Sequence, residues 1–204
     1  MTLRVAVGTR DVTLTAPVGT SDTELSRFLS AEGSWIQARL DALPKPNLPK
    51  PGDTLEVLGE AFTLQEGGTQ RVKRDGSTLL VPGEDEVFRT RLRSWVKSRA
   101  KKAGTAACDR YCAKLGVSYQ RLSLRDPRSR WGSCTSEGYV MLSWRLALAP
   151  RKVFDYVAAH EVAHLRELHH GPAFWETVER LMPDFEKPRA WLKDHGPELH
   201  AIRI

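Results

Sequence analysis

Short runs of β-branched residues dominate the first 82 residues and predict a β-rich module. Residues 3–7 (LRVAV) and 11–16 (DVTLTA), separated by Gly8-Thr9-Arg10, have the pattern of a β-hairpin. Four further short strands are predicted in the second half of the module, at residues 54–58, 61–65, 70–74 and 78–81. Asp75-Gly76 joins the last two of these strands and is a strong hairpin signal.

One helical segment and one extended connector separate the two groups of strands. Apolar residues recur at helical spacing from Leu25 to about Leu43, and Gly33 is a point where this helix could be interrupted. Ser21 and Glu24 have the spacing of a capping box, which marks a helix start. Residues 44–53 (PKPNLPKPGD) contain four prolines, which neither a helix interior nor a central strand accommodates.

The pattern turns helical from residue 84 to about 115. Asp85 and Glu86 stand where a helix N-terminus favours negative charge. Between Arg89 and Lys102 there are seven basic residues and no acidic ones. This basic helix at residues 89–102 is either the solvated side of a core-packed helix or a groove for an acidic partner such as nucleic acid.

The remaining pattern predicts a small sheet and further helices. Strands are expected at residues 117–124 and 139–145, with the turn-rich DPRSRWGSCTSEG between them, and Pro150 then opens a helix at residues 151–168. These elements together predict an α+β fold with two domains. The first is the β-rich N-terminal module with one helix at residues 1–82, and the second spans residues 83–204.

Composition narrows the class of protein. With 41% hydrophobic and 27% charged residues, the chain can build a core of one or two domains and is not expected to be disordered. The first residues contain no apolar stretch of signal-peptide length, and no window has the ~20 apolar residues that a membrane helix needs, so neither element is expected. Cys108, Cys112 and Cys134 do not make a disulfide framework, so a cytoplasmic location is expected. The net charge of +6 permits anionic partners without requiring them.

The helix predicted at residues 151–168 contains His160-Glu161-Val162-Ala163-His164. Two histidines four residues apart project from one helix face, where their ring nitrogens can bind one metal ion. A glutamate directly after the first histidine can act as general base toward a water molecule that the metal activates. At ~100° per residue, all three side chains fall on the apolar stripe of the helix, where burial is costly unless they are paired or ligated. This placement favours a metal site over two core histidines bonded to carbonyl groups.

A catalytic zinc takes three protein ligands and keeps one position open for water, so a third ligand is expected after His164. The candidates are His169, His170, Glu176, Glu179, His195 and His200. His170 lies ten residues after His160, the offset of the third histidine in the metzincin pattern, although Glu167 stands where that pattern has glycine. The alternative is Glu176 or Glu179, on the helix that Pro172 would open.

Three blocks of the sequence resemble the YgjP-like metallopeptidases, which are related to the SprT-like and WLM zinc proteases. The blocks are SRWGSC (129–134), LSWRLALAP (142–150) and HEVAHLRELHHGPAFW (160–175), and their order and spacing match. The resemblance implies a zincin-like metallopeptidase domain at residues 83–204 that binds one Zn²⁺ per chain. In the family pattern a small residue, two further residues and then Phe-Trp follow the third histidine, which here favours His170 as a ligand.

The resemblance also suggests where a substrate would bind. In zinc peptidases of this design an edge strand beside the active-site helix pairs with the substrate backbone. By that analogy the strand at 139–145, with Leu142, Ser143 and Trp144, would line the cleft, and Arg130 and Trp131 would shape one end of it. Alternatively, Trp131 packs in the core and Arg130 pairs with a carboxylate.

The predicted function is endopeptidase hydrolysis of a protein or peptide substrate, with Glu161 as general base. The sequence leaves the group that stabilises the oxyanion open, among the candidates Arg130, Tyr156, His169 and His195. Other functions also stay open. One is a basic nucleic-acid-associated protein with a structural zinc, which would need four protein ligands. The others are a zinc hydrolase with a non-peptide substrate and a protease recruited to DNA-bound proteins by the basic helix.

Overall fold

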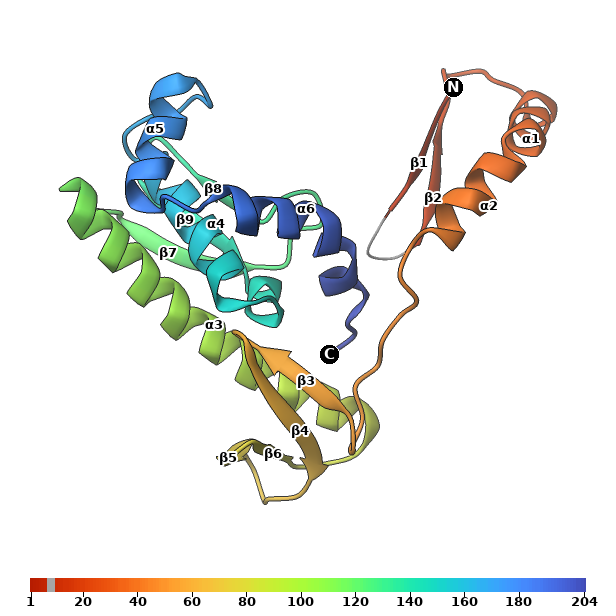
Figure 1. The fold of residues 1–204 in the computed structure, drawn as a ribbon. Helices are drawn as coiled ribbons and strands as arrows, with labels where there is room; N and C mark the ends of the chain where they lie inside the picture. The colour runs from red at the N-terminus through yellow and green to blue at the C-terminus, as the bar shows by residue number, and fades with distance from the viewer. Residues whose placement is uncertain (7–9) are drawn as a thin grey trace.

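The structure is a computed structural model that describes residues 1–6 and 10–204 and has an α+β fold (Figure 1). An N-terminal unit stands apart from the body of the molecule and is joined to it by an extended segment (Figure 1). In this unit β1 (Thr2–Val5) pairs antiparallel with β2 (Val12–Thr15), which confirms the predicted hairpin. Part of the predicted turn, Gly8 and Thr9, lies outside the described residues.

Two short helices complete the N-terminal unit, α1 (Asp22–Ala31) and α2 (Gly33–Asp41). The predicted capping box is present, because the Ser21 hydroxyl accepts from the Glu24 amide while the Glu24 carboxylate accepts from the Ser21 amide. The helix is interrupted at Gly33, as the sequence suggested. No described residue of these two helices is buried, so the unit has little core of its own.

A four-stranded sheet follows the connector. Its strands are β3 (Thr54–Val57), β4 (Glu60–Glu66), β5 (Lys73–Asp75) and β6 (Thr78–Val81). The strand order is β3-β4-β6-β5, with β4 and β6 parallel and the β5–β6 hairpin turning at Gly76. Alternate residues of this sheet, such as Phe62, Leu64 and Leu79, are fully buried and join the core that extends to the last helices. The domain boundary at residue 82 stays a prediction.

The body of the molecule is organised around one long helix, α3 (Asp85–Leu115), which ends at Gly116 in a left-handed conformation with φ 68°. A three-stranded sheet packs on it, formed by β7 (Arg121–Arg125), β8 (Gly132–Cys134) and β9 (Tyr139–Ser143). The remaining elements are η1 (Trp144–Leu148), α4 (Arg151–Ala163), α5 (Pro172–Leu181) and α6 (Glu186–Ala201).

The order of the three-stranded sheet corrects one expectation. The order is β7-β9-β8, so β9 is the central strand and its backbone groups are paired on both sides. The prediction of an edge strand at residues 139–145 is therefore wrong. The edge strand beside α4 is β8. This strand was not predicted from the sequence, because its segment has the composition of a turn.

Helix α4 lies at the centre of the body, in contact with α3, α5, α6 and the three-stranded sheet. It can approach α3 closely because the facing positions of α3 are small. A Cβ added at Gly104 would lie 3.6 Å from the ring of Phe154 on α4 and 3.3 Å from Leu142 on β9. Ala159 and Ala163, on the side of α4 opposite its histidines, are also fully buried. The backbone of α4 is thus held on all sides.

Candidate metal centre

Two of the histidines singled out from the sequence lie on α4, with ring centroids 5.1 Å apart. The helix ends at Ala163, earlier than the predicted Leu168, because the backbone changes to tighter turns, in which the amides of Leu165 and Arg166 bond three residues back. The turn is held to the site by His164, whose Nδ1 lies 3.0 Å from the carbonyl oxygen of Glu167. This early exit from the helix brings residue 170 back over α4.

His170 completes a cluster with the two α4 histidines. One ring nitrogen from each of His160, His164 and His170 lies within 4.8 Å of the others, and the Nε2 atoms of His160 and His170 are 3.0 Å apart. Four of the other five candidates for the third ligand lie elsewhere in the described structure. Glu176 and Glu179 line a separate cavity on α5, while His195 and His200 stack on tryptophan rings.

An aromatic side chain that sequence reasoning did not single out supports this cluster. Phe174, on the first turn of α5, is fully buried, and its ring centroid lies 4.5–4.8 Å from those of all three histidines. Its position four residues after His170, in the Phe-Trp pair, was the signal available in the sequence. Phe174 therefore packs against the rings of His160, His164 and His170 and restricts their movement.

The histidine cluster fits a divalent metal ion. Burial lowers the pKa of His160 to about 3 and also lowers the pKa of His164, so both rings are neutral. A neutral His164 that donates its Nδ1 proton to the Glu167 carbonyl keeps the lone pair on Nε2 free for a ligand. The facing Nε2 atoms of His160 and His170 repel unless a proton or a cation lies with them, and a metal satisfies both lone pairs.

Glu161 is buried beside the histidines, with an exposed fraction of 4%. Its side chain passes directly over the backbone of Gly132 on β8, where an added Cβ would lie 2.6 Å from both Cγ and Cδ of the glutamate. Burial raises the pKa of Glu161 to about 8, and the positive charge of Arg130 opposes this rise. The carboxyl group therefore lies in a position that only glycine at residue 132 allows.

A cavity of about 220 Å³ opens next to Glu161 and His160. Its walls come from the start of β8 and the segment before it, from α4 and from α6: Arg130, Trp131, Gly132, Tyr156, Val157 and Leu192. Of the four candidates for oxyanion stabilisation, Arg130 and Tyr156 line this cavity, whereas His169 and His195 do not.

The predicted cleft residues divide into two groups. Arg130 is exposed and Trp131 is partly buried against the core, and both line the cavity. Leu142, Ser143 and Trp144 are almost completely buried, with exposed fractions of 0–1%. The expectation that these three line a substrate cleft is wrong, because they lie on or just after the central strand of the sheet.

The basic helix within α3 is largely engaged by the protein itself. Arg99 pairs with Glu60, Lys101 donates to the carbonyl of Leu122, and Lys97 lies over the ring of Trp144. The predicted nucleic-acid partner gains no support from these contacts. Cys108 and Cys112 are buried side chains of the same helix, as expected for core residues. None of the described helices is long and apolar enough to cross a bilayer.

Comparisons with known proteins identify the family of this chain. None of the curated proteins matches the chain. Among solved structures, a metallopeptidase zymogen, Pyrococcus abyssi abylysin, is similar over 45% of this chain and 93% of that one, with 17% sequence identity and a TM-score of 0.41. Residues 1–195 match the family described as YgjP-like, metallopeptidase domain. Because this match spans nearly the whole sequence, the chain belongs to the YgjP-like metallopeptidase family.

Proposed function

We propose that this metallopeptidase is a zinc-dependent endopeptidase that holds one Zn²⁺ through His160, His164 and His170 and uses Glu161 as general base. The observation that carries the proposal is the position of Glu161. A carboxyl group is buried beside three convergent imidazole rings and opens onto a cavity large enough for a side chain. Burying a glutamate side chain costs folding free energy, so its presence here points to a chemical role.

The donor set supports a catalytic zinc rather than a structural one. Three imidazole nitrogens suit Zn²⁺, and three ligands leave one coordination position open. A structural zinc would take four protein ligands, and the cluster among the described residues has three. When bound, the ion supplies Lewis acidity, which lowers the pKa of water and polarises a substrate carbonyl.

Glu161 moves the proton in this proposal. Its carboxylate accepts a proton from the water that attacks the peptide carbonyl, and it then donates that proton to the nitrogen of the leaving amine. The burial of Glu161 beside the three histidines places its carboxyl group where it can accept and then release this proton away from bulk water. Arg130 or Tyr156, in the cavity wall, would stabilise the negative charge that develops on the carbonyl oxygen.

The substrate backbone is proposed to add to the outer edge of β8. This strand contacts α4 and, within the described part of the chain, pairs only with β9. An extended peptide can pair with such an edge while one side chain enters the cavity beside Trp131. The cavity of about 220 Å³ is smaller than the ~300–1,000 Å³ of sites for whole small molecules, which suits a single side chain.

The test combines metal content with activity. Metal analysis by mass spectrometry on untagged protein should find about one zinc per chain in the wild type and none in His164→Ala or His170→Ala. Glu161→Gln should keep the zinc and lose about 10²–10⁴-fold in the rate of hydrolysis of an unfolded protein substrate. Glu167→Gln is the matched control, because the substitution keeps the backbone carbonyl that contacts His164, and it should remain active. Full activity in Glu161→Gln would refute the assignment of the base.

A further inference from the structure

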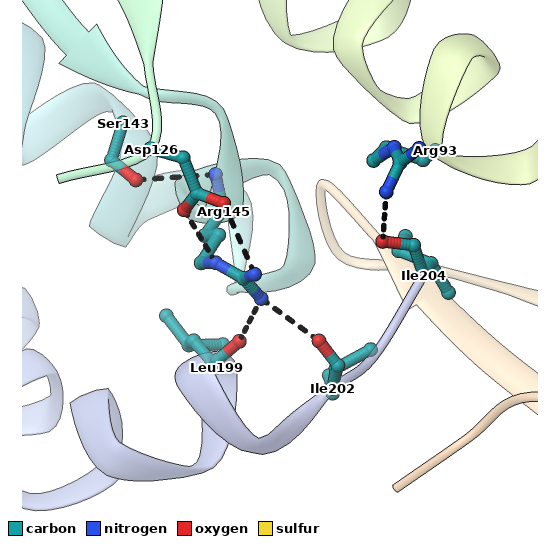
Figure 2. A network of polar contacts seen from close by, with 7 residues as sticks. All are labelled: Arg93, Asp126, Ser143, Arg145, Leu199, Ile202 and Ile204. Carbon is teal, nitrogen blue, oxygen red and sulfur yellow. Dashed lines mark hydrogen bonds and ion pairs between the residues drawn. The ribbon is translucent and has the colours of Figure 1, made fainter. Parts of the chain in front are cut away.

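One buried charge outside the metal centre is joined to the wall of the cavity. Arg145, in η1, has an exposed fraction of 8%, and each nitrogen of its guanidinium group has a partner (Figure 2). Nε and Nη2 donate to the two carboxylate oxygens of Asp126 at 2.6 and 3.2 Å. Nη1 donates to the carbonyl oxygens of Leu199 and Ile202 at 3.1 and 2.8 Å. We call Arg145 and these partners the clamp.

The clamp joins two segments that are far apart in the sequence. Asp126 follows β7 directly, at the start of the segment that leads to Arg130 and Trp131. Leu199 and Ile202 lie at the C-terminal end of α6, where carbonyl groups lack helical partners and a positive charge is favourable. Arg145 thus caps α6 and holds the start of the 126–131 segment with one planar group.

Both clamped segments reach the same ring in the cavity wall. Trp131 stacks on His200 of α6, with ring centroids 4.7 Å apart and planes at 26°. It also packs on Gly196 of α6, where an added Cβ would lie 3.1 Å from the indole. Leu192, one turn earlier on α6, lines the cavity beside Trp131. The position of this wall therefore depends on how α6 sits against the 126–131 segment.

Stability alone is a weak reason for such a group. The Asp126 side chain is 44% exposed, so solvent screens its attraction to Arg145. The burial of the Arg145 charge costs desolvation free energy, so the pair contributes little net stability. What a guanidinium supplies is geometry, since its rigid planar fork fixes several acceptors relative to one another. A lysine at the same position would keep the charge and lose the fork.

We propose that Arg145 is a positioning residue for the substrate cavity: through Asp126 and the end of α6 it sets Trp131 against His200, and so the width of the cavity beside Glu161. This inference rests on the proposed function for its effect on substrate. The arrangement of Trp131 itself can be measured without any activity.

The experiment follows the indole N–H resonance of Trp131 by ¹⁵N NMR, assigned by its absence in Trp131→Phe. In Asp126→Asn and Arg145→Lys this resonance should shift, and the KM for a peptide substrate should rise about tenfold while kcat changes by less than about twofold. Metal content should stay at the wild-type level. Glu60→Gln is the control, because it removes ion pairs with Arg74 and Arg99, neither of which belongs to the clamp, and should alter neither the resonance nor the KM.

The outcomes separate the two proposals. A lower unfolding temperature with an unchanged Trp131 resonance and KM in both clamp variants would show that the clamp is only structural. A wild type without peptidase activity would refute the proposed function, and the resonance would still decide whether the clamp positions Trp131. If Arg145→Lys fails to fold, Asp126→Asn alone decides whether the clamp positions Trp131. The Asp126 carboxylate is partly exposed, so replacing it with an amide should destabilise the fold little.

Discussion

Gly132 offers the most direct perturbation of the proposed base. Its backbone angles are open to any residue, so the requirement for glycine comes from space alone. A Cβ at this position would lie 2.6 Å from Cγ and Cδ of Glu161, where ordinary contacts are 3.4–4 Å. In Gly132→Ala the carboxyl group must therefore move by about 1 Å, the difference between these distances.

The expected effect on catalysis exceeds the effect on stability. A displacement of about 1 Å at a reacting group can reduce the rate on the order of 100-fold. Overpacking at a buried site costs about 1–3 kcal/mol of folding free energy, and the edge position of β8 allows part of it to relax. The nearest atoms to the added Cβ all belong to Glu161, which is not a proposed ligand, so the zinc content should stay at about one per chain.

The assay compares kcat/KM, zinc content and denaturant unfolding for Gly132→Ala and Gly171→Ala. Gly171 is a matched control, because it adjoins His170, has φ −81°, and an added Cβ there would meet no atom within 4 Å. The control should retain wild-type activity. A kcat/KM of Gly132→Ala within about threefold of the wild-type value would be a much smaller loss than a misplaced reacting group causes. The close contact between residue 132 and Glu161 would then not govern catalysis.

Two further predictions concern the surroundings of the site. Phe174→Leu removes the ring that contacts all three histidines, so zinc affinity in a chelator competition should fall about 10–100-fold. An unchanged affinity would show that the Phe174 ring is not needed to hold the histidines for the metal. Burial, and then the charge of Arg145, lower the pKa of His200 to about 4, so the unfolded chain binds this proton more tightly than the folded one. The free energy of unfolding of the wild type should therefore fall relative to that of His200→Gln as the pH drops from 6.5 toward 4, by at most about 3 kcal/mol. If unfolding depends on pH in the same way in both proteins, His200 does not have a lowered pKa in the folded state.

Local signals in the sequence were sufficient for most elements. The capping box at Ser21, the Asp75-Gly76 turn and the helical spacing from residue 84 each act over a few residues, and the structure has the corresponding elements. The strand β8 was missed because its residues, Gly132 to Cys134, have no β-branched or alternating pattern. Their strand conformation comes from pairing with β9, a contact that the local sequence does not encode.

The sequence by itself determined the motif of the site, because the spacing of His160, Glu161 and His164 on one helix follows from helical geometry alone. Only the tertiary structure decided the rest. The convergence of His170 with the α4 histidines depends on where α4 ends, and the identity of the edge strand depends on the order of three strands in a sheet. Gly132 and Arg145 meet their partners 29 and 54 residues away, at Glu161 and Leu199, so their roles arise from long-range packing that no local pattern records.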